Sequence, residues 1–192
     1  MFKKTKKLAL NTKILRFLLV PTILFSTLFS NNIPEAKAGL EFQWDQNSGL
    51  RRLKWLQKEN KRNFRNTIYF FLRPLDRNNE LLKINLAIPK SFKSKLNKEK
   101  ISLCKVRIGG FENRTKCLED IPADIEINND ESSLRSIDIF LTGQFLSDKE
   151  SYAIVLKVIN PKRSGLYQFH SYGQPKGESV STYLGSWTIV ID

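Results

Sequence analysis

Apolar and polar residues alternate in short runs along the second two thirds of the chain. Residues 68–72 and 82–88 place an apolar side chain at every second position, and Pro74 and Pro89 follow the two runs. Such alternation is typical of strands that bury one face. The same pattern predicts further strands over residues 101–108, 113–118, 124–128, 136–141, 152–159, 166–172 and 182–191.

About nine strands separated by turn-forming residues, with no recurring 3.6-residue pattern among them, predict an all-β fold. Residues 152–159 are apolar on both faces except at Lys157, which indicates a central strand between two layers. We therefore expect an antiparallel, immunoglobulin-like β-sandwich over residues 67–192. A closed β-barrel is the alternative.

Residues 39–66 do not follow this pattern and form a basic N-terminal arm. One interpretation is an amphipathic segment that lies on an anionic membrane surface. The other is an edge strand or short helix whose tryptophans, Trp44 and Trp55, pack on the sandwich. We favour the second, because no clean apolar stripe is present. The residues that would contact an anionic surface are Arg51, Arg52, Lys54, Lys58, Lys61, Arg62 and Arg65.

The first 38 residues have the three parts of a secretory signal peptide. A basic start precedes the apolar run 17–29, and Ala36-Lys37-Ala38 follows as an A-x-A cleavage site. The apolar run is shorter than the ~20 residues that a membrane-spanning helix needs. We therefore expect export to the periplasm or cell surface and cleavage near Ala38. A leader that stays uncleaved and tethers the protein to the membrane is the alternative.

The charge of the exported part is moderate. The full chain carries +13, but the leader holds seven Lys and Arg and one Glu, so residues 39–192 carry +7. Such a charge usually forms a solvated basic face, and it would attract anionic lipid or acidic polysaccharide. We expect an envelope component of unknown identity as the partner. Nucleic acid is not expected, because exported proteins rarely meet it and the sequence shows no motif for it.

Cys104 and Cys117 are the two cysteines of the chain, and an oxidising destination favours a disulfide between them. If residues 109–112 form a hairpin loop, the flanking strands place the two cysteines directly opposite each other, within disulfide reach. A metal-binding or reactive pair lacks support, because the chain has no Cys-x-x-Cys and one histidine.

Catalytic chemistry has little support in the sequence. His170 is the one histidine, and alternation places it on the wetter face of strand 166–172. No Gly-x-Ser-x-Gly, Ser-x-x-Lys or His-Glu-x-x-His occurs. We expect a non-enzymatic binding or structural module without a cofactor, metal or catalytic residue. A metal-assisted hydrolase is the alternative, and it would use the acidic region Glu119, Asp120, Asp124, Glu126, Asp130 and Glu131, which we expect instead to be a solvated edge.

Aromatic residues gather in the last two expected strands. They are Tyr167, Phe169, Tyr172, Tyr183 and Trp187. Aromatics at this spacing usually pack in the core and across strands. A carbohydrate-stacking platform would require several of them on one exposed face, and periodicity does not decide which face is wet.

Four stretches of the C-terminal half resemble one known family. They are 117–123, 160–169, 174–177 and 183–191, and they contain Asn-Pro…Gly-x-Tyr-x-Phe, a Pro-x-Gly turn and a closing Tyr-Leu-Gly strand. The family comprises exported cyanobacterial proteins with a domain of unknown function, number 2808. The chain departs from it at His170-Ser171-Tyr172, where family members often carry apolar residues. The resemblance implies a secreted or periplasmic all-β domain with no established reaction.

Several residues of these motifs have structural interpretations. Pro161 opens a turn, and Gly165 is expected to take a positive φ before the next strand. Gly185 in mid-strand predicts a bulge or a close approach of a neighbouring side chain. The remaining turn residues are Gly109, Gly110 and Gly177.

Overall fold

The computed structural model describes residues 51–110, 113–129 and 135–192. The expected leader and residues 39–50 of the basic arm lie outside the described residues. Within the described ranges, no helix has both the length and the apolar character that crossing a bilayer requires.

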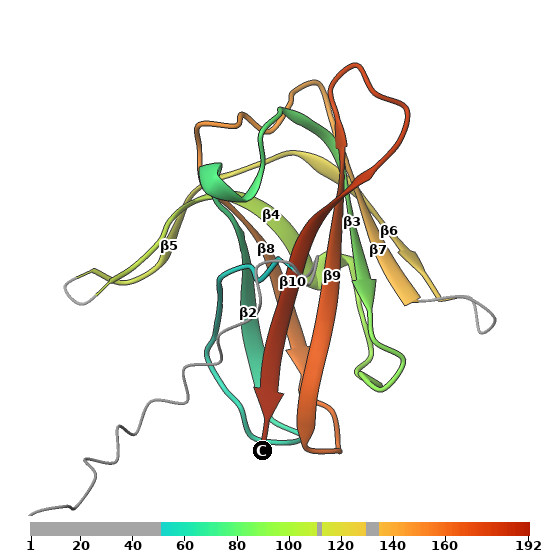
Figure 1. Ribbon diagram of the computed structural model, residues 1–192. Helices are drawn as coiled ribbons and strands as arrows, with labels where there is room; N and C mark the ends of the chain where they lie inside the picture. Colours follow the sequence, from blue (N-terminus) through green and yellow to red (C-terminus); the bar gives the residue numbers. More distant parts are fainter. Residues whose placement is uncertain (1–50, 111–112, 130–134) are drawn as a thin grey trace, which may run out of the picture. The chain divides into compact units, whose positions relative to one another are not determined.

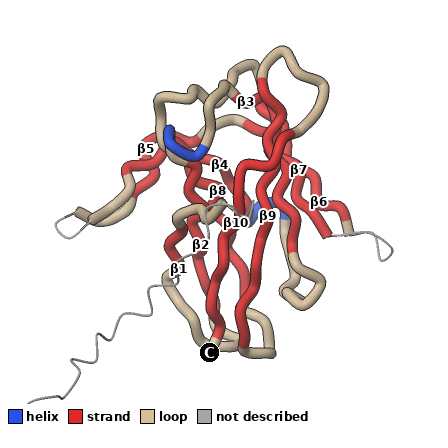
Figure 2. The backbone as a smooth tube through the Cα atoms, viewed as in Figure 1, coloured by secondary structure: helices blue, strands red, loops and turns tan. Residues whose placement is uncertain are grey.

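The described residues form ten strands in two antiparallel five-stranded sheets (Figures 1 and 2). The first sheet has the order β1 (Trp55–Gln57), β2 (Arg65–Leu72), β8 (Tyr152–Ile159), β4 (Ile101–Arg107) and β5 (Lys116–Asp120). The second has the order β10 (Thr182–Ile191), β9 (Gly165–Pro175), β3 (Leu81–Ile88), β7 (Arg135–Leu141) and β6 (Ala123–Asn128). Short 3-10 turns, η1 (Pro74–Asp76) and η2 (Lys98–Lys100), precede β3 and β4.

The prediction of an antiparallel sandwich is confirmed, and the alternative of a closed barrel is wrong. Strands β1 and β5 are the edges of the first sheet, and β10 and β6 are the edges of the second, so neither sheet closes on itself. Each of the nine predicted strands is present, and β1 is the tenth.

The core lies between the sheets and centres on aromatic rings. Phe70 of β2 contacts Phe169 of β9 and Trp187 of β10, with ring centroids 4.9 Å apart in both pairs. Phe92, in the loop after β3, meets Phe169 edge-on at 5.0 Å. All four rings are fully buried, and each contributes about 1.5–3 kcal/mol through removal of its apolar surface from water.

Residues 51–57 cross from the second sheet to the first. The amide of Ser186 in β10 donates to the Arg51 carbonyl (2.7 Å), and the amide of Leu53 donates to the Ser186 carbonyl (2.8 Å). One residue later the Lys54 carbonyl accepts from the amide of Phe71 in β2 (3.1 Å). The Trp187 indole N–H joins the two sheets at this crossing, because it donates to the carbonyls of Lys54 (3.0 Å) and Phe71 (3.3 Å).

The described part of the basic arm is therefore built into the sandwich. Residues 55–57 form the edge strand β1, which pairs with β2, and Trp55 packs against the core. Trp44, the other tryptophan of the arm, lies outside the described residues. The structure extends the sandwich from the expected start at 67 back to residue 51, since residues 51–53 and β1 are hydrogen-bonded to the sheets.

The Cys104–Cys117 disulfide is present, with the Sγ atoms 2.04 Å and the Cα atoms 5.7 Å apart. It lies on the outer face of the first sheet, where Cys104 packs with Phe71, Val106 and Val155. The predicted register is wrong. Cys104 is paired with Asp120 and Cys117 with Val106. Next to the loop, Arg107 already pairs with Lys116, two positions beyond its predicted partner, and a bulge between Lys105 and Val106 shifts the pairing by one more. The pair thus bridges diagonally on one face.

Gly185 is required by a close approach. Strand β10 has a bulge between Tyr183 and Gly185, and Gly185 adopts φ +146°. A Cβ atom there would lie 2.7 Å from the Arg51 carbonyl oxygen and 2.7 Å from Cγ of Leu53. Only glycine lets the crossing segment lie against β10 here. The turn residues Gly165 and Gly177 also adopt positive φ.

We predict that Gly185→Ala lowers the free energy of unfolding by about 2–4 kcal/mol, through backbone strain and overpacking. Gly165→Ala is the matched control, because Gly165 has φ +145° but a Cβ added there would meet no atom within 4 Å. Urea denaturation followed by tryptophan fluorescence measures both. Equal losses in the two variants would show that the close approach at Gly185 contributes nothing.

We predict that reduction of the disulfide lowers the free energy of unfolding by about 3 kcal/mol, the chain-entropy value for a loop closed over a separation of 13 residues. Denaturant curves with and without dithiothreitol test this. A Cys104→Ala/Cys117→Ala variant should unfold at the midpoint of the reduced protein and should not respond to the reductant. A reduced protein as stable as the oxidised one would contradict the prediction.

Candidate functional site

The outer face of the second sheet carries two rows of side chains across its strands. The strand registers align the first row across all five strands as Tyr183, Tyr172, Asn85, Asp138 and Glu126. We call it the tyrosine–amide row. The second row begins on the crossing segment and contains Arg52, Ser186, His170, Ala87, Ser136 and Asn128.

The two tyrosines and His170 form one cluster between these rows. The rings of Tyr172 and Tyr183 lie 5.6 Å apart, and the His170 ring lies 6.3 Å from that of Tyr183. All three side chains are half-buried. The Ser186 hydroxyl links two of them, since its Oγ lies 2.6 Å from the Tyr183 hydroxyl and 2.7 Å from His170 Nδ1. Tyr183 and His170 are thus held in place, and Tyr172 packs beside Tyr183.

Asp138 fixes the amide part of the row. It accepts hydrogen bonds from Nδ2 of Asn85 (2.9 Å) and Nδ2 of Asn128 (2.7 Å), and Lys83 Nζ lies 2.8 Å away. Burial by itself raises the pKa of Asp138, but the hydrogen bonds from Lys83, Asn85 and Asn128 outweigh burial and hold the pKa below its ordinary value. Asp138 therefore stays ionised at neutral pH and orients its three partners.

The Ser186–His170 contact does not form a hydrolytic site. Ser186 is 4% exposed, so a substrate carbonyl has no access to its hydroxyl. Its backbone amide donates to the Arg51 carbonyl and cannot stabilise an oxyanion. The prediction that His170 lies on the wetter face of its strand is confirmed.

The acidic residues that the alternative enzyme hypothesis requires are dispersed. Glu119 and Asp120 lie on β5 of the first sheet, whereas Asp124 and Glu126 lie on β6 of the second, and all four are exposed. Asp130 and Glu131 lie outside the described residues. Where side chains are described, no group of three His, Cys, Asp or Glu residues gathers to hold a metal ion.

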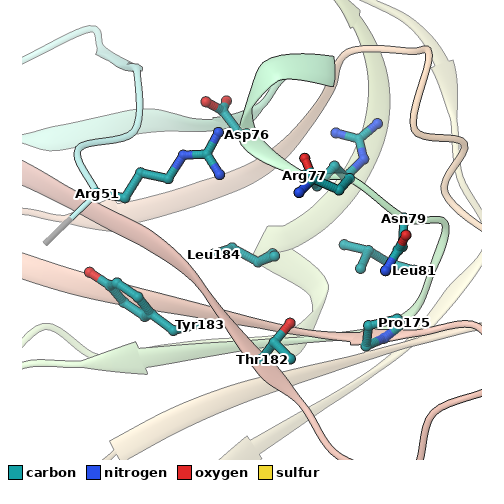
Figure 3. Close-up of a pocket in the computed structure, with 10 residues that line it drawn as sticks. Arg51, Asp76, Arg77, Asn79, Leu81, Pro175, Thr182, Tyr183 and Leu184 are labelled. Atoms are coloured by element: carbon teal, nitrogen blue, oxygen red, sulfur yellow. The ribbon is translucent and has the colours of Figure 1, made fainter. Parts of the chain in front are cut away.

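A hollow of about 140 Å³ lies beside η1 and the start of β10 (Figure 3). Its charged neighbours are committed to the fold. Arg77 is 3% exposed and donates to the carbonyls of Leu72, Ser147 and Glu150, and burial lowers its pKa. Asp76 forms an ion pair with Arg73 (2.8 Å). Arg51, labelled in Figure 3, also lines the hollow, and its Nη2 donates to the Leu75 carbonyl, so the charged side chains around the hollow are engaged by protein atoms.

The structure separates the seven basic residues proposed from the sequence into two groups, although all are exposed. Arg51, Arg52 and Lys54 lie on the crossing segment, and Arg52 joins the outer face of the second sheet beside Ser186. The other four lie after β1: Lys58, Lys61 and Arg62 are in the loop between β1 and β2, and Arg65 is the first residue of β2.

Only part of the tyrosine–amide row could be predicted from the sequence. Alternation separates Tyr172 from Tyr167 and Phe169, and the structure buries those two with Trp187 in the core. The proximity of Tyr183 to Tyr172 depends on the bulge at Gly185, and that of Asn85 and Asp138 depends on the order of the strands. The available signal was the pairing of Tyr172 with Tyr183 on one side and with Asn85 on the other, and it requires the register to be known.

Solved structures with a similar arrangement of strands have low sequence identity to the chain. A bacterial hydrophobin, BslA, is 13% identical, with a TM-score of 0.44, over 74% of this chain and 95% of that one. A collagen-binding domain from a Staphylococcus aureus adhesin is 11% identical, with a TM-score of 0.38, over 71% and 95%. An uncharacterised Nocardia farcinica protein with an immunoglobulin-like fold is 9% identical, with a TM-score of 0.39, over 73% and 97%.

Among curated proteins, none matches the sequence. A family model does match, over residues 46–191, which include both sheets, the crossing segment and the tyrosine–amide row. The chain belongs to the family described as protein of unknown function (DUF2808).

Proposed function

We propose that this protein is an exported, non-enzymatic binding module of a cyanobacterial cell envelope, and that the outer face of its second sheet binds a polysaccharide. The observation that carries the proposal is the Tyr172–Tyr183 pair, 5.6 Å between ring centroids, beside a row of amide and carboxylate groups. Two features support export. The N-terminal residues have the parts of a secretory signal peptide, and a disulfide is typical of proteins in an oxidising compartment.

The chemistry of this face suits a sugar chain. The C–H face of a pyranose packs on an aromatic ring, and two neighbouring rings support consecutive residues of a glycan. Sugar hydroxyls both donate and accept hydrogen bonds, as do the amides of Asn85, Gln168 and Gln174 on the same face. Asp138 and Ser136 add acceptors. The row crosses the full width of the sheet, so an extended chain fits better than a small molecule.

A binding role also agrees with the rigidity of the face. The Ser186 hydroxyl holds Tyr183 and His170, and Asp138 holds Lys83, Asn85 and Asn128. Side chains fixed before binding lose little conformational entropy when a ligand arrives. A ligand on this face does not need to contact Ser186, because the role of this buried residue is to hold Tyr183 and His170 in place.

We predict that Tyr172→Ala weakens binding to an envelope polysaccharide about tenfold or more, because the loss of about 1.4 kcal/mol of ring contact corresponds to a factor of ten. Tyr172→Phe should retain most of the affinity, because the stacking surface remains. Affinity electrophoresis in gels that contain purified polysaccharide gives both dissociation constants.

Tyr69→Ala is the matched control, because Tyr69 is a half-buried tyrosine beside Phe71 on the outer face of the first sheet. It should bind as the wild type does. Circular dichroism melting curves check that each variant is folded. The proposal that this face binds polysaccharide would be refuted if folded Tyr172→Ala bound every polysaccharide that the wild type binds with the same affinity as the wild type.

A further inference from the structure

A group of exposed cations lies at one end of the sandwich. The loop of residues 58–64 and the loop of residues 160–164 meet there, near the C-terminal residue labelled in Figure 1. The amide of Asn160 donates to the Phe64 carbonyl (2.8 Å), and the amide of Arg62 donates to the Asp192 carbonyl (3.1 Å). We call this region the basic end. It carries six exposed cations, namely Lys58, Lys61, Arg62, Arg65, Lys162 and Arg163.

None of these six side chains is in a salt bridge within the described part of the chain, although Nε of Arg62 donates a hydrogen bond to the Asp192 carbonyl (3.2 Å). The salt bridges near the opposite end join Arg73 to Asp76, Lys105 to Glu150 and Lys176 to Glu80. Salt bridges therefore neutralise part of the positive charge near the opposite end, where exposed cations such as Arg114, Lys116 and Lys149 also remain outside the described salt bridges, whereas none of the cations at the basic end is in one. The loop after β3 adds Lys90 and Lys93, and its Phe92 meets Tyr167 at 5.3 Å, next to the start of β9.

Large apolar side chains project between the cations. Phe64 is 54% exposed, Ile159 is 55% exposed and Leu166 is 72% exposed. Ile159 is the register partner of Arg65, and Phe64 precedes Arg65 in the chain. Leu166 pairs with Val190 on the other sheet, so the apolar tips surround the end of the sandwich.

The backbone beneath the basic end is tied down by two buried asparagines. Asn66 and Asn160 are 3% and 2% exposed, and Asn66 Nδ2 donates to Asn160 Oδ1 (3.0 Å). Asn160 Nδ2 also donates to the Lys61 carbonyl (2.8 Å), and Asn66 Oδ1 accepts from the amide of Glu59 (3.0 Å). The exposure of Phe64 is therefore built into the fold, since its carbonyl and its neighbours are fixed.

We propose that the basic end docks on an anionic lipid bilayer. Cations without partners match the negative headgroups of such a surface. The exposed apolar tips then enter the boundary between headgroups and acyl chains, where side chains of this kind gain free energy. A lipid bilayer can deform around exposed side chains such as these, so it suits the basic end better than a folded protein partner. The hollow described above is lined by other residues. The surface is separate from the tyrosine–amide row and does not depend on its function.

The test uses the full chain and two kinds of vesicle, pure phosphatidylcholine and phosphatidylcholine with 30% phosphatidylglycerol. The basic-end variant is Lys61→Gln/Lys162→Gln/Arg163→Gln, whose side chains make no salt bridge in the described structure. Each removed cation is expected to weaken binding to the anionic vesicles about fivefold, so the variant should bind about a hundredfold more weakly. A leader that inserts on its own would bind both kinds of vesicle and would be unaffected by these changes.

The matched control removes three exposed cations near the opposite end, Arg114→Gln/Lys116→Gln/Lys149→Gln, and has the same net charge as the basic-end variant. It should change the affinity less than about threefold. Phe64→Ser should weaken binding to anionic vesicles further, and raised salt should weaken the wild type. Equal losses in the two triple variants would mean diffuse attraction and would overturn the proposal. So would wild-type binding that does not depend on phosphatidylglycerol, or binding only to an acidic polysaccharide.

Discussion

The fold depends on the buried indole of Trp187. A buried N–H without a partner costs about 1–3 kcal/mol, and this one has two acceptors, the carbonyls of Lys54 and Phe71. Those carbonyls belong to the crossing segment and to β2, whereas Trp187 belongs to β10. One side chain thus holds the crossing segment between the sheets, and Gly185 supplies the space that the segment needs. The sandwich is closed along this side by residues 51–57.

Local pattern was enough to predict the strands, but not how they pair. Alternation and short apolar runs located β2 to β10, because most of these strands bury at least one face. It could not set the hairpin register, because the bulge between Lys105 and Val106 leaves no mark on the alternation. It also did not locate β1, a strand of three residues, although an edge strand or short helix was the favoured interpretation of the basic arm. The tyrosine–amide row depends on β9 lying between β10 and β3, an order that no local signal records.

The two proposed surfaces use different properties of the same scaffold. On the outer face of the second sheet, Ser186 and Asp138 fix several side chains, and the strand register decides which of them lie together. The basic end is formed mostly by loops, and the buried Asn66–Asn160 pair holds the backbone beneath its exposed cations. A protein that rests on its end would leave the side of the sandwich accessible, so both surfaces could be occupied together.

The side of the sandwich opposite the crossing segment is open, and its two edge strands are acidic. Strand β5 presents Glu119 and Asp120, and β6 presents Asp124 and Glu126. Unpaired strand edges are templates on which further chains can add strands and start aggregates. Two copies that approached edge to edge would bring these carboxylates together, and their repulsion opposes the addition. The acidic residues that looked in the sequence like a metal-binding region are thus suited to keep copies apart at high local concentration.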